Sequence, residues 1–249
     1  MKSNFDRRTN YIKINYQTQR ENLSLSSNSL DLASLSNLDI QNLERCLRTC
    51  IKEKASQGNY TVAIAILDRL IALNPDNAAD YNNRGLMYFR NNQITEALCD
   101  LSQALLIDPC LDSAYNNRAN CHAAEGNLIE AIADYDLALD LNPANLHAWI
   151  DRGITLRELE SYDLAIENFE ITLIIGNALE ERIYAERGRT YHLRGDWNCA
   201  VGDYQKALNI LKTKPQSAKY RQQVMGWLDE LIAPLLIGDR RSNSTNCDR

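Results

Sequence analysis

The chain has 249 residues, of which 45% are hydrophobic and 24% are charged, and its formal net charge is −6. These values are ordinary for a globular protein that buries a sizeable core. The net negative charge argues against a general nucleic-acid binder, which usually presents a basic stripe. No apolar run approaches the ~18 residues that a membrane span needs, so no transmembrane segment is expected.

The N-terminal residues differ from the rest of the chain. Residues 1–20 contain five Lys and Arg against one Asp, and residues 23–37 are mostly Ser, Leu and Asn. No apolar segment follows the basic residues, so a secretory signal is not expected. We expect residues 1–43 to form a polar and basic tail, largely disordered, that leads into the first helix. An organelle transit peptide and a partner-binding arm are the alternatives that the sequence leaves open.

The stretch from Ala78 to Asn145 contains one pattern twice. The segment YNNRGLMYFRNNQITEALCDLSQALLIDP is followed, 34 residues later, by YNNRANCHAAEGNLIEAIADYDLALDLNP. Extension of this period in both directions gives five units, with one inserted residue between Asn177 and Glu180. The units are residues 44–77, 78–111, 112–145, 146–180 and 181–214. A repeat of this length indicates an array of similar structural units.

Within a unit, an aromatic residue is followed by a small residue and a second aromatic, then by Ala-x3-apolar and a closing Pro. In the second unit these residues are Tyr81, Gly85, Tyr88, Ala97, Leu101, Ala104 and Pro109. The pattern resembles the tetratricopeptide repeat (TPR), and the resemblance covers residues 44–214. It implies an all-α fold, a right-handed α-solenoid of stacked antiparallel helix pairs. Helix A then runs from about the second to the fourteenth position of a unit, and helix B from about the seventeenth to the thirtieth.

Columns of small residues mark the expected contact between helix A and helix B. Helix A contributes Gly85, Ala119, Gly153 and Gly188, and helix B contributes Ala97, Ala131, Ala165 and Ala200. Small side chains let two helices approach closely. Bulky residues in the other columns are expected to fill the space between units, because stacking of neighbours stabilises a solenoid.

The seventh position is Arg in four units, and the twenty-third position is Asp or Asn in the same four. The pairs are Arg84 with Asp100, Arg118 with Asp134, Arg152 with Asn168, and Arg187 with Asp203. The first unit has lost both members and has Cys50 and Ile66 instead. This joint change favours pairs that fix one helix against the other, because a half-buried Arg needs a partner. The alternative is that the arginines line a face that binds phosphate or acidic groups.

A further helix is expected after the last unit, where Lys214-Pro215 breaks the repeat. Its apolar stripe consists of Tyr220, Val224, Trp227, Leu228 and Leu231. The helix should begin near Ser217 and stop at about Ala233, before Pro234. We expect residues 215–237 to cap the last apolar face of the array and residues 238–249 to be disordered.

The sequence contains no motif of a catalytic or metal site. The seven Cys form no CxxC pair, and the three His complete no metal-ligand spacing. The nucleophile-elbow, P-loop, HExxH and dinucleotide-binding motifs are absent. We predict no enzyme activity, no cofactor, no metal and no small-molecule substrate. The unpaired Cys suggest a reducing, cytoplasmic compartment, with an organelle stroma or matrix as the alternative.

The resemblance implies that residues of helix A line a concave groove that binds a partner. The residues predicted for this groove are Arg48, Lys52, Asn82, Asn83, Phe89, Arg90, Asn116, Asn117, Asn120, Asp151, Arg157, Glu186 and Arg189. An Asn amide offers both a donor and an acceptor, so the central Asn residues can pair with a peptide backbone, while charged residues at the ends set the register. Simple tolerance of solvent is the alternative explanation of these Asn residues.

These observations favour a non-catalytic scaffold or adaptor that binds a peptide or helix of a partner protein, and more specifically a factor that assists the assembly of a complex. The alternative function is a regulator that contacts nucleic acid or an acidic partner through the basic N-terminal arm. Nucleic-acid binding through that arm would depend strongly on salt.

Overall fold

A computed structural model of the protein describes residues 37–242, and the side chains among them from 41 to 233. The chain divides into two units, Met1–Cys46 and Leu47–Arg249. Of the first unit only residues 37–46 are described, and they form the first half of one helix. The predicted disorder of residues 1–36 and 243–249, and the role of the N-terminal arm, concern residues outside the described part.

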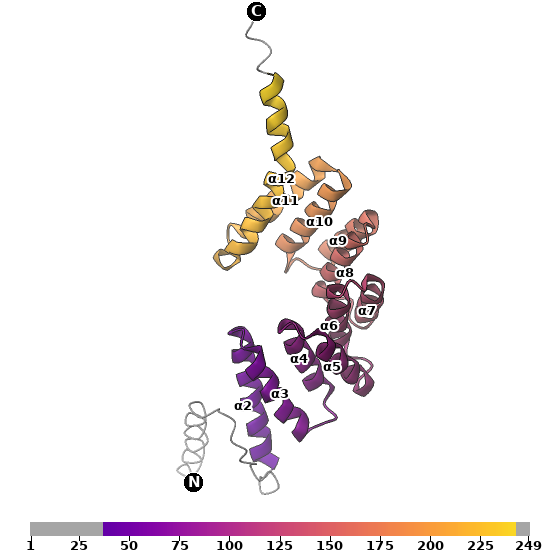
Figure 1. The fold of residues 1–249 in the computed structure, drawn as a ribbon, viewed down its shortest axis with the longest axis vertical. Coiled ribbons are helices and arrows are strands. Elements are labelled where there is room, and N and C mark those ends of the chain that lie inside the picture. The colour runs from indigo at the N-terminus through magenta and orange to yellow at the C-terminus, as the bar shows by residue number, and fades with distance from the viewer. Residues whose placement is uncertain (1–36, 243–249) are drawn as a thin grey trace, which may run out of the picture. The chain divides into compact units, whose positions relative to one another are not determined.

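The described residues form an all-α repeat superhelix of paired helices, as predicted (Figure 1). Helices A are α2 (Asn37–Ser56), α4 (Ala78–Arg90), α6 (Asp112–Ala124), α8 (Leu146–Glu158) and α10 (Glu180–Arg194). Helices B are α3 (Tyr60–Leu73), α5 (Ile94–Ile107), α7 (Leu128–Leu141), α9 (Tyr162–Ile175) and α11 (Trp197–Leu211). A 3₁₀ helix, η2 (Pro215–Ser217), precedes the last helix, α12 (Ala218–Ser242).

The repeat pattern predicts most of the helix bounds. Helices α3, α5, α7 and α9 each span the seventeenth to the thirtieth position of their unit. Asparagine side chains cap several helix starts: Asn59 accepts a hydrogen bond from the backbone of Val62, and Asn145 accepts one from the backbone of Ala148. Each cap satisfies an N–H group that has no partner within its helix.

The helix that opens the array starts earlier than predicted. Helix α2 begins at Asn37, whereas the unit frame placed the start of the first helix A near residue 45. The apolar residues Ile40, Leu43, Leu47 and Ile51 recur at helical spacing across the boundary of the unit. This periodicity continues upstream of the repeat, so the helix does too.

The last helix continues beyond its predicted end. Helix α12 extends to Ser242 and passes through Pro234, where we expected it to stop. Proline has no N–H group, so it removes the backbone hydrogen bond to the residue four positions earlier and disfavours the helix at that point. It does not forbid helical structure on its C-terminal side. Residues 238–242, which we assigned to the C-terminal tail, belong to α12.

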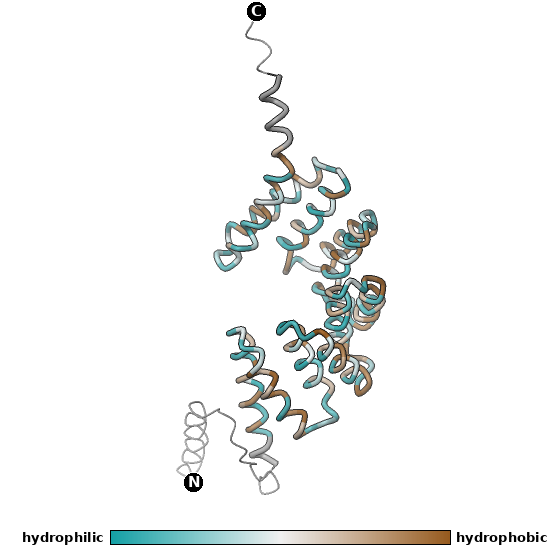
Figure 2. Tube along the Cα trace, viewed as in Figure 1, coloured by the Kyte–Doolittle hydropathy of each residue, from teal (hydrophilic) through white to brown (hydrophobic). Residues whose placement is uncertain are grey.

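Small residues bring helix A and helix B of a unit into contact, as predicted. A Cβ atom added to Gly85 would lie 2.8 Å from Leu101 Cγ, and one added to Gly188 would lie 3.0 Å from Tyr204 Cδ1. The alanines of helix B are fully buried: Ala63, Ala97, Ala131, Ala165 and Ala200. Figure 2 shows hydrophobic residues concentrated on α5 and α7, and hydrophilic residues on α4 and α6. Within residues 37–242, none of the helices has both the length and the apolar character that a bilayer crossing requires.

The turn between helix A and helix B contains one residue with positive φ. Gly58, Gly126 and Gly195 have φ angles of 73°, 82° and 95°, and Asn92 and Glu160 have φ angles of 60° and 58°. All five occupy the fifteenth position of their units. Glycine adopts this conformation without strain, and Asn tolerates it, whereas Glu does so rarely. Glu160 is therefore the residue of this column whose backbone is most strained.

Replacement of Glu160 by glycine is expected to raise the free energy of unfolding by about 1 kcal/mol, because the strain of a side chain at positive φ disappears. The Glu160 side chain is exposed, so little packing is lost. Urea denaturation of the full chain measures the change. The reverse substitution in the preceding unit, Gly126→Glu, should lower the stability by a similar amount. Equal stabilities of wild type and Glu160→Gly would contradict this explanation.

Candidate functional site

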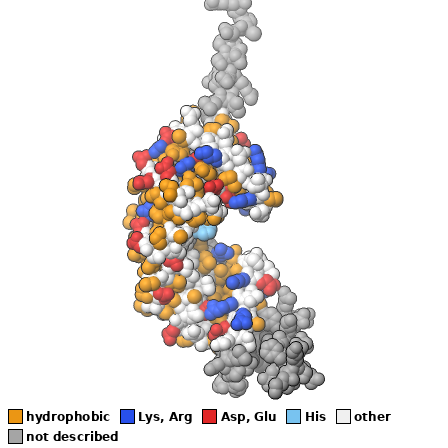
Figure 3. Space-filling model, turned by 180° about the vertical axis from the view of Figure 1, so that it is seen from behind, with side chains coloured by type: hydrophobic (Ala, Val, Ile, Leu, Met, Phe, Trp, Pro, Cys, Tyr) orange, Lys and Arg blue, Asp and Glu red, His pale blue; other side chains and the backbone are white. Residues whose placement is uncertain are grey.

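Helices A line one side of the unit Leu47–Arg249, which we call the inner face. Helices α4, α6 and α8 lie on this side, and α5, α7 and α9 lie on the opposite, outer side (Figure 1). Consecutive helices A touch, since α4 contacts α6, α6 contacts α8 and α8 contacts α10. The space-filling view shows a hollow with Lys and Arg side chains on one wall and a His at its base (Figure 3). All residues predicted to bind a partner belong to helices A.

The pairs predicted within the repeats are present. Arg118 donates two hydrogen bonds of 2.7 Å to the carboxylate of Asp134. Arg84 does the same with Asp100, also at 2.7 Å. The remaining two pairs, at 2.7 to 3.0 Å, are Arg152 with Asn168 and Arg187 with Asp203. The four arginines are thus engaged inside the array, which confirms the structural interpretation over the anion-binding one.

Three of these arginines also reach the preceding unit, a contact that our sequence analysis missed. Each pairs with an acidic residue on helix B of that unit, at 2.7 to 3.7 Å. The acidic residues are Asp68, Asp136 and Glu170, all at the twenty-fifth position of their units. Because these acidic residues recur at one position of the repeat, the sequence could have indicated this contact between units. Arg118 is the exception, because Ser102 stands at that position.

A second set of polar contacts joins helix A of one unit to helix A of the next. Between α2 and α4, Arg48 donates two hydrogen bonds to Asp80, whose side chain is 1% exposed. Between α4 and α6, the amide of Asn82 donates to Ser113 at 3.5 Å and accepts from Asn117 at 2.9 Å. Side chains that we predicted to bind a partner are therefore used to hold neighbouring units together.

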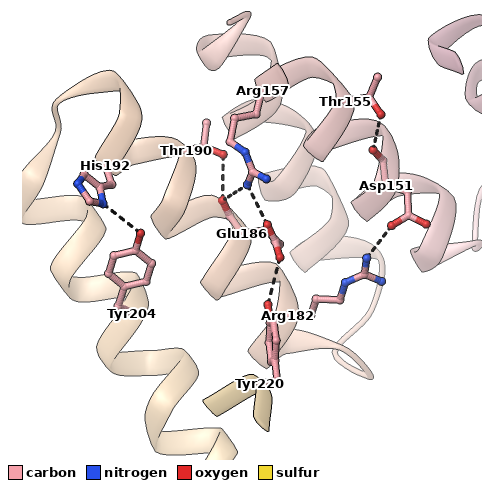
Figure 4. A network of polar contacts seen from close by, with 9 residues as sticks. All are labelled: Asp151, Thr155, Arg157, Arg182, Glu186, Thr190, His192, Tyr204 and Tyr220. Carbon is pink, nitrogen blue, oxygen red and sulfur yellow. Dashed lines mark hydrogen bonds and ion pairs between the residues drawn. The ribbon is translucent and has the colours of Figure 1, made fainter. Parts of the chain in front are cut away.

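These contacts are most extensive where α8, α10 and α12 meet (Figure 4). Arg157 donates to Glu186 at 2.8 Å, and Arg182 donates to Asp151 at 2.7 Å. Tyr220 of α12 donates to the other carboxylate oxygen of Glu186 at 3.2 Å. Glu186 is thus bonded from both sides and links the fifth unit to the fourth unit and to the last helix.

All but one of the predicted partner-binding residues fall into two groups. Those bonded within the array are Arg48, Asn82, Asn117, Asn120, Asp151, Arg157, Glu186 and Arg189. Asn82 is only 7% exposed, so we assign it to the stacking of units. Within the described part, no hydrogen bond or ion pair engages the side chains of Lys52, Asn83, Arg90 and Asn116. Phe89 packs, half-buried, against the apolar cluster of α5 and α6.

The contacts between successive helices A are interrupted between α6 and α8. Asn145, the N-cap of α8, donates to Asp112 of α6 at 3.5 Å. Among the described residues, no side chain within α6 forms a hydrogen bond with one within α8, and a cavity of about 190 Å³ lies between them. The residues that line it are Asn120, Ala123, Ala124, Tyr135, Asp151, Ile154, Thr155 and Glu158. We call this cavity the α6–α8 pocket.

The pocket offers hydrogen-bond acceptors. Tyr135 donates its hydroxyl hydrogen to Asn120 at 2.6 Å, and Thr155 donates to the backbone carbonyl of Asp151 at 2.9 Å. Both residues are only 1% exposed, so the acceptors that the pocket offers are the carboxylates of Asp151 and Glu158. The side chain of Asp151 is 19% exposed, and burial raises the pKa of this carboxyl although Arg182 pairs with it. A further hydrogen-bond donor would thus stabilise the carboxylate.

An unsatisfied acceptor lies next to this pocket. The Oδ1 atom of Asn116 is buried and has no hydrogen-bond partner in the described part. Asn116 precedes Asn120 by four residues on α6, so the two side chains lie on the same face of the helix. Buried acceptors without a partner are uncommon in folded proteins and call for an explanation. Because this atom is buried, it is not itself a contact that a partner can reach in this structure.

Six residues of the pocket were missing from our prediction, and three of them are polar. Glu158 stands at the thirteenth position of its unit, a groove position of the family, so the repeat pattern could have included it. Thr155 stands at the tenth position, which holds none of the residues predicted for the groove, and it is 1% exposed. Tyr135 belongs to helix B, in a column that also holds Leu101 and Phe169, and nothing in the sequence marks its hydroxyl as part of a site.

Comparison with known proteins supports the family assignment. Two family models, both described as tetratricopeptide repeat, match residues 54–119 and 113–145. No match to a curated protein was found.

Solved structures share the fold of this chain. MamA matches with 23% identity and a TM-score of 0.57, over 67% of this chain and 96% of that chain. A thermophilic TPR protein of Thermus thermophilus matches with 16% identity and a TM-score of 0.63, over 73% of this chain and 98% of that chain. The APC/C hetero-tetramer Cut9–Hcn1 matches with 22% identity and a TM-score of 0.67, over 76% of this chain and 36% of that chain. With the family matches and the paired helices, these findings show that the chain belongs to the tetratricopeptide-repeat proteins.

Proposed function

We propose that the protein is a non-catalytic scaffold that binds a segment of a partner protein on its inner face, with the α6–α8 pocket as the central subsite. The observation that supports this most is the interruption between α6 and α8. At the other junctions, side chains of successive helices A bond to each other, whereas here the carboxylates of Asp151 and Glu158 line a cavity. Such a site suits an adaptor, or an assembly factor that holds a subunit before it joins a complex.

The charges of the inner face indicate the chemistry of the segment. The pocket presents the carboxylates of Asp151 and Glu158, so a Lys, Arg or amide side chain of the partner complements it. Towards the first repeat, the cations Lys52 and Arg90 are exposed and favour an acidic residue of the partner. A segment with a donor at the pocket and an acidic residue near α2 and α4 would therefore bind in one direction only.

The substitution Glu158→Lys tests this proposal. A display library of random peptides, selected against the wild-type chain, supplies the probes. We expect the selected peptides to bind Glu158→Lys at least about tenfold more weakly, because a charge-assisted hydrogen bond contributes about 1.5–3 kcal/mol. The new side chain also places a positive charge at the pocket.

The matched control is Glu167→Lys, which makes the same charge change at an exposed position of α9. It should leave the affinity unchanged. Equal losses in both variants would show that net charge, not the pocket, governs binding. If the library yields no binder, or if binders lose nothing in Glu158→Lys, the pocket is not the subsite that we propose.

A further inference from the structure

The last helix is covered by the array on one side only. Val224 and Leu231 of α12 are buried in the apolar cluster of the fifth unit. Gly226 faces the other way, and a Cβ atom added there would meet no atom within 4 Å. In α10, by contrast, a Cβ atom on Gly188 would lie 3.0 Å from Tyr204 of helix B. Helix α12 thus resembles a helix A that has no helix B among the described residues.

The neighbours of Met225 support this comparison. In the full repeats, the residue at the twenty-fifth position lies beside the seventh-position Arg of the next unit, as Glu170 lies beside Arg187 at 3.7 Å. Gln205 occupies the twenty-fifth position of the fifth unit, and it lines one groove together with Met225. Met225-Gly226 therefore stands where the Arg-Gly pair of a helix A would stand, with an apolar side chain in place of the cation.

A groove of about 540 Å³ runs between α11 and α12. Its lining residues are Gln205, Leu208, Asn209, Lys212, Arg221, Met225, Leu228 and Asp229. The apolar members come from both helices, and Met225 is 48% exposed. We call it the α11–α12 groove. It lies where a helix B would pack against α12.

The exposed side of α12 is complementary to itself. Arg221, Met225 and Asp229 are spaced by four residues, so they form one stripe along the helix. Arg221 and Asp229 are exposed, and in the described part neither side chain has an ion-pair partner. A two-fold axis at Met225 would place Arg221 of each copy against Asp229 of the other. The absence of a side chain at Gly226 lets a second helix approach closely.

We propose that the α11–α12 groove binds the α12 helix of a second copy of this chain, in an antiparallel pair centred on Met225. The interface is isologous, as in most homodimers, so the same residues act on both sides. Each α12 takes the place of the helix B that the other lacks. This interface is separate from the inner face, so each inner face stays open to its own partner.

The oligomeric state of the full chain tests the proposal. We expect sedimentation equilibrium to show a monomer–dimer equilibrium for the wild type in the micromolar range and a monomer for Met225→Glu. The matched control is Ile174→Glu, because Ile174 of α9 is 85% exposed and lies far along the chain from the groove. It should dimerise like the wild type. A monomeric wild type, or a dimer that Ile174→Glu dissociates and Met225→Glu does not, overturns the proposal.

A charge exchange tests the antiparallel arrangement itself. Arg221→Asp and Asp229→Arg should each raise the dimer dissociation constant at least about tenfold, because each creates two like-charge contacts at the interface. The double variant Arg221→Asp/Asp229→Arg should restore dimerisation, since the opposite charges again face each other. Circular dichroism checks that all variants remain folded. Failure of the double variant to recover overturns the antiparallel pairing.

Discussion

Replacement of Arg118 by leucine is expected to lower the free energy of unfolding by about 3 kcal/mol, the lower end for removal of one partner of a buried ion pair. The side chain of Asp134 is only 7% exposed, and that of Arg118 is 24% exposed. The hydrogen bonds that Arg118 donates to Asp134 raise the pKa of Arg118, so the ionised pair is the stable form. Without the guanidinium, the carboxylate of Asp134 stays in the interior with its charge uncompensated.

The effect of this substitution is easier to interpret than that of the other arginines in the column, because Arg118 has no acidic partner on the preceding helix B. One other side chain could compensate: His122 Nε2 lies 4.0 Å from Asp134 Oδ2. Urea denaturation of Arg118→Leu in a background that also carries His122→Gln excludes that compensation. An unchanged denaturation midpoint would show that the pair does not hold the two helices together.

The first unit provides the control for this experiment. It has Cys50 and Ile66 at the two positions, where Cys50 is half-buried and Ile66 packs against the apolar cluster of the unit. The double substitution Arg118→Cys/Asp134→Ile places the two residues of the first unit at the same positions of the third unit. It should recover most of the stability lost in Arg118→Leu, because an apolar pair leaves no unpaired charge. If the double variant is as unstable as the single one, the loss does not come from the carboxylate.

The repeat made the fold predictable, and its limits made the two ends of the array unpredictable. Inside the array every helix is specified several times over, by columns of small, aromatic and capping residues that recur from unit to unit. The start of α2 and the end of α12 have no such copies. At these two ends the predicted bounds depended on single residues, and the rule that proline ends a helix was wrong at Pro234.

The inner face was less predictable than the fold, because a groove position does not reveal whether a side chain is already bonded. Asn82 and Asn116 stand at the same position of consecutive units. The first is bonded to Asn117 and is buried, whereas the buried Oδ1 of the second has no partner. The difference arises from contacts between units. Such contacts depend on geometry in three dimensions, and the α6–α8 pocket is visible only there.

Replacement of Gly153 by valine is expected to lower the free energy of unfolding by about 3 kcal/mol, at the upper end for overpacking of a core. A Cβ atom at this position would lie 2.7 Å from Phe169 Cζ and 2.8 Å from Asn168 Nδ2. Neither neighbour can move easily. Phe169 is fully buried, and the Asn168 amide donates a 2.6 Å hydrogen bond to the carbonyl of Trp149.

Gly202→Val separates this clash from the general effect of valine in a helix. Gly202 lies within α11, and a Cβ atom there would meet no atom within 4 Å. We expect the free energy of unfolding of Gly202→Val to differ from that of the wild type by less than about 0.5 kcal/mol. Thermal denaturation followed by circular dichroism compares the two variants. Equal losses would assign the cost to helix propensity. A loss confined to Gly153→Val assigns it to the close approach of α8 and α9, the contact on which every unit of the array depends.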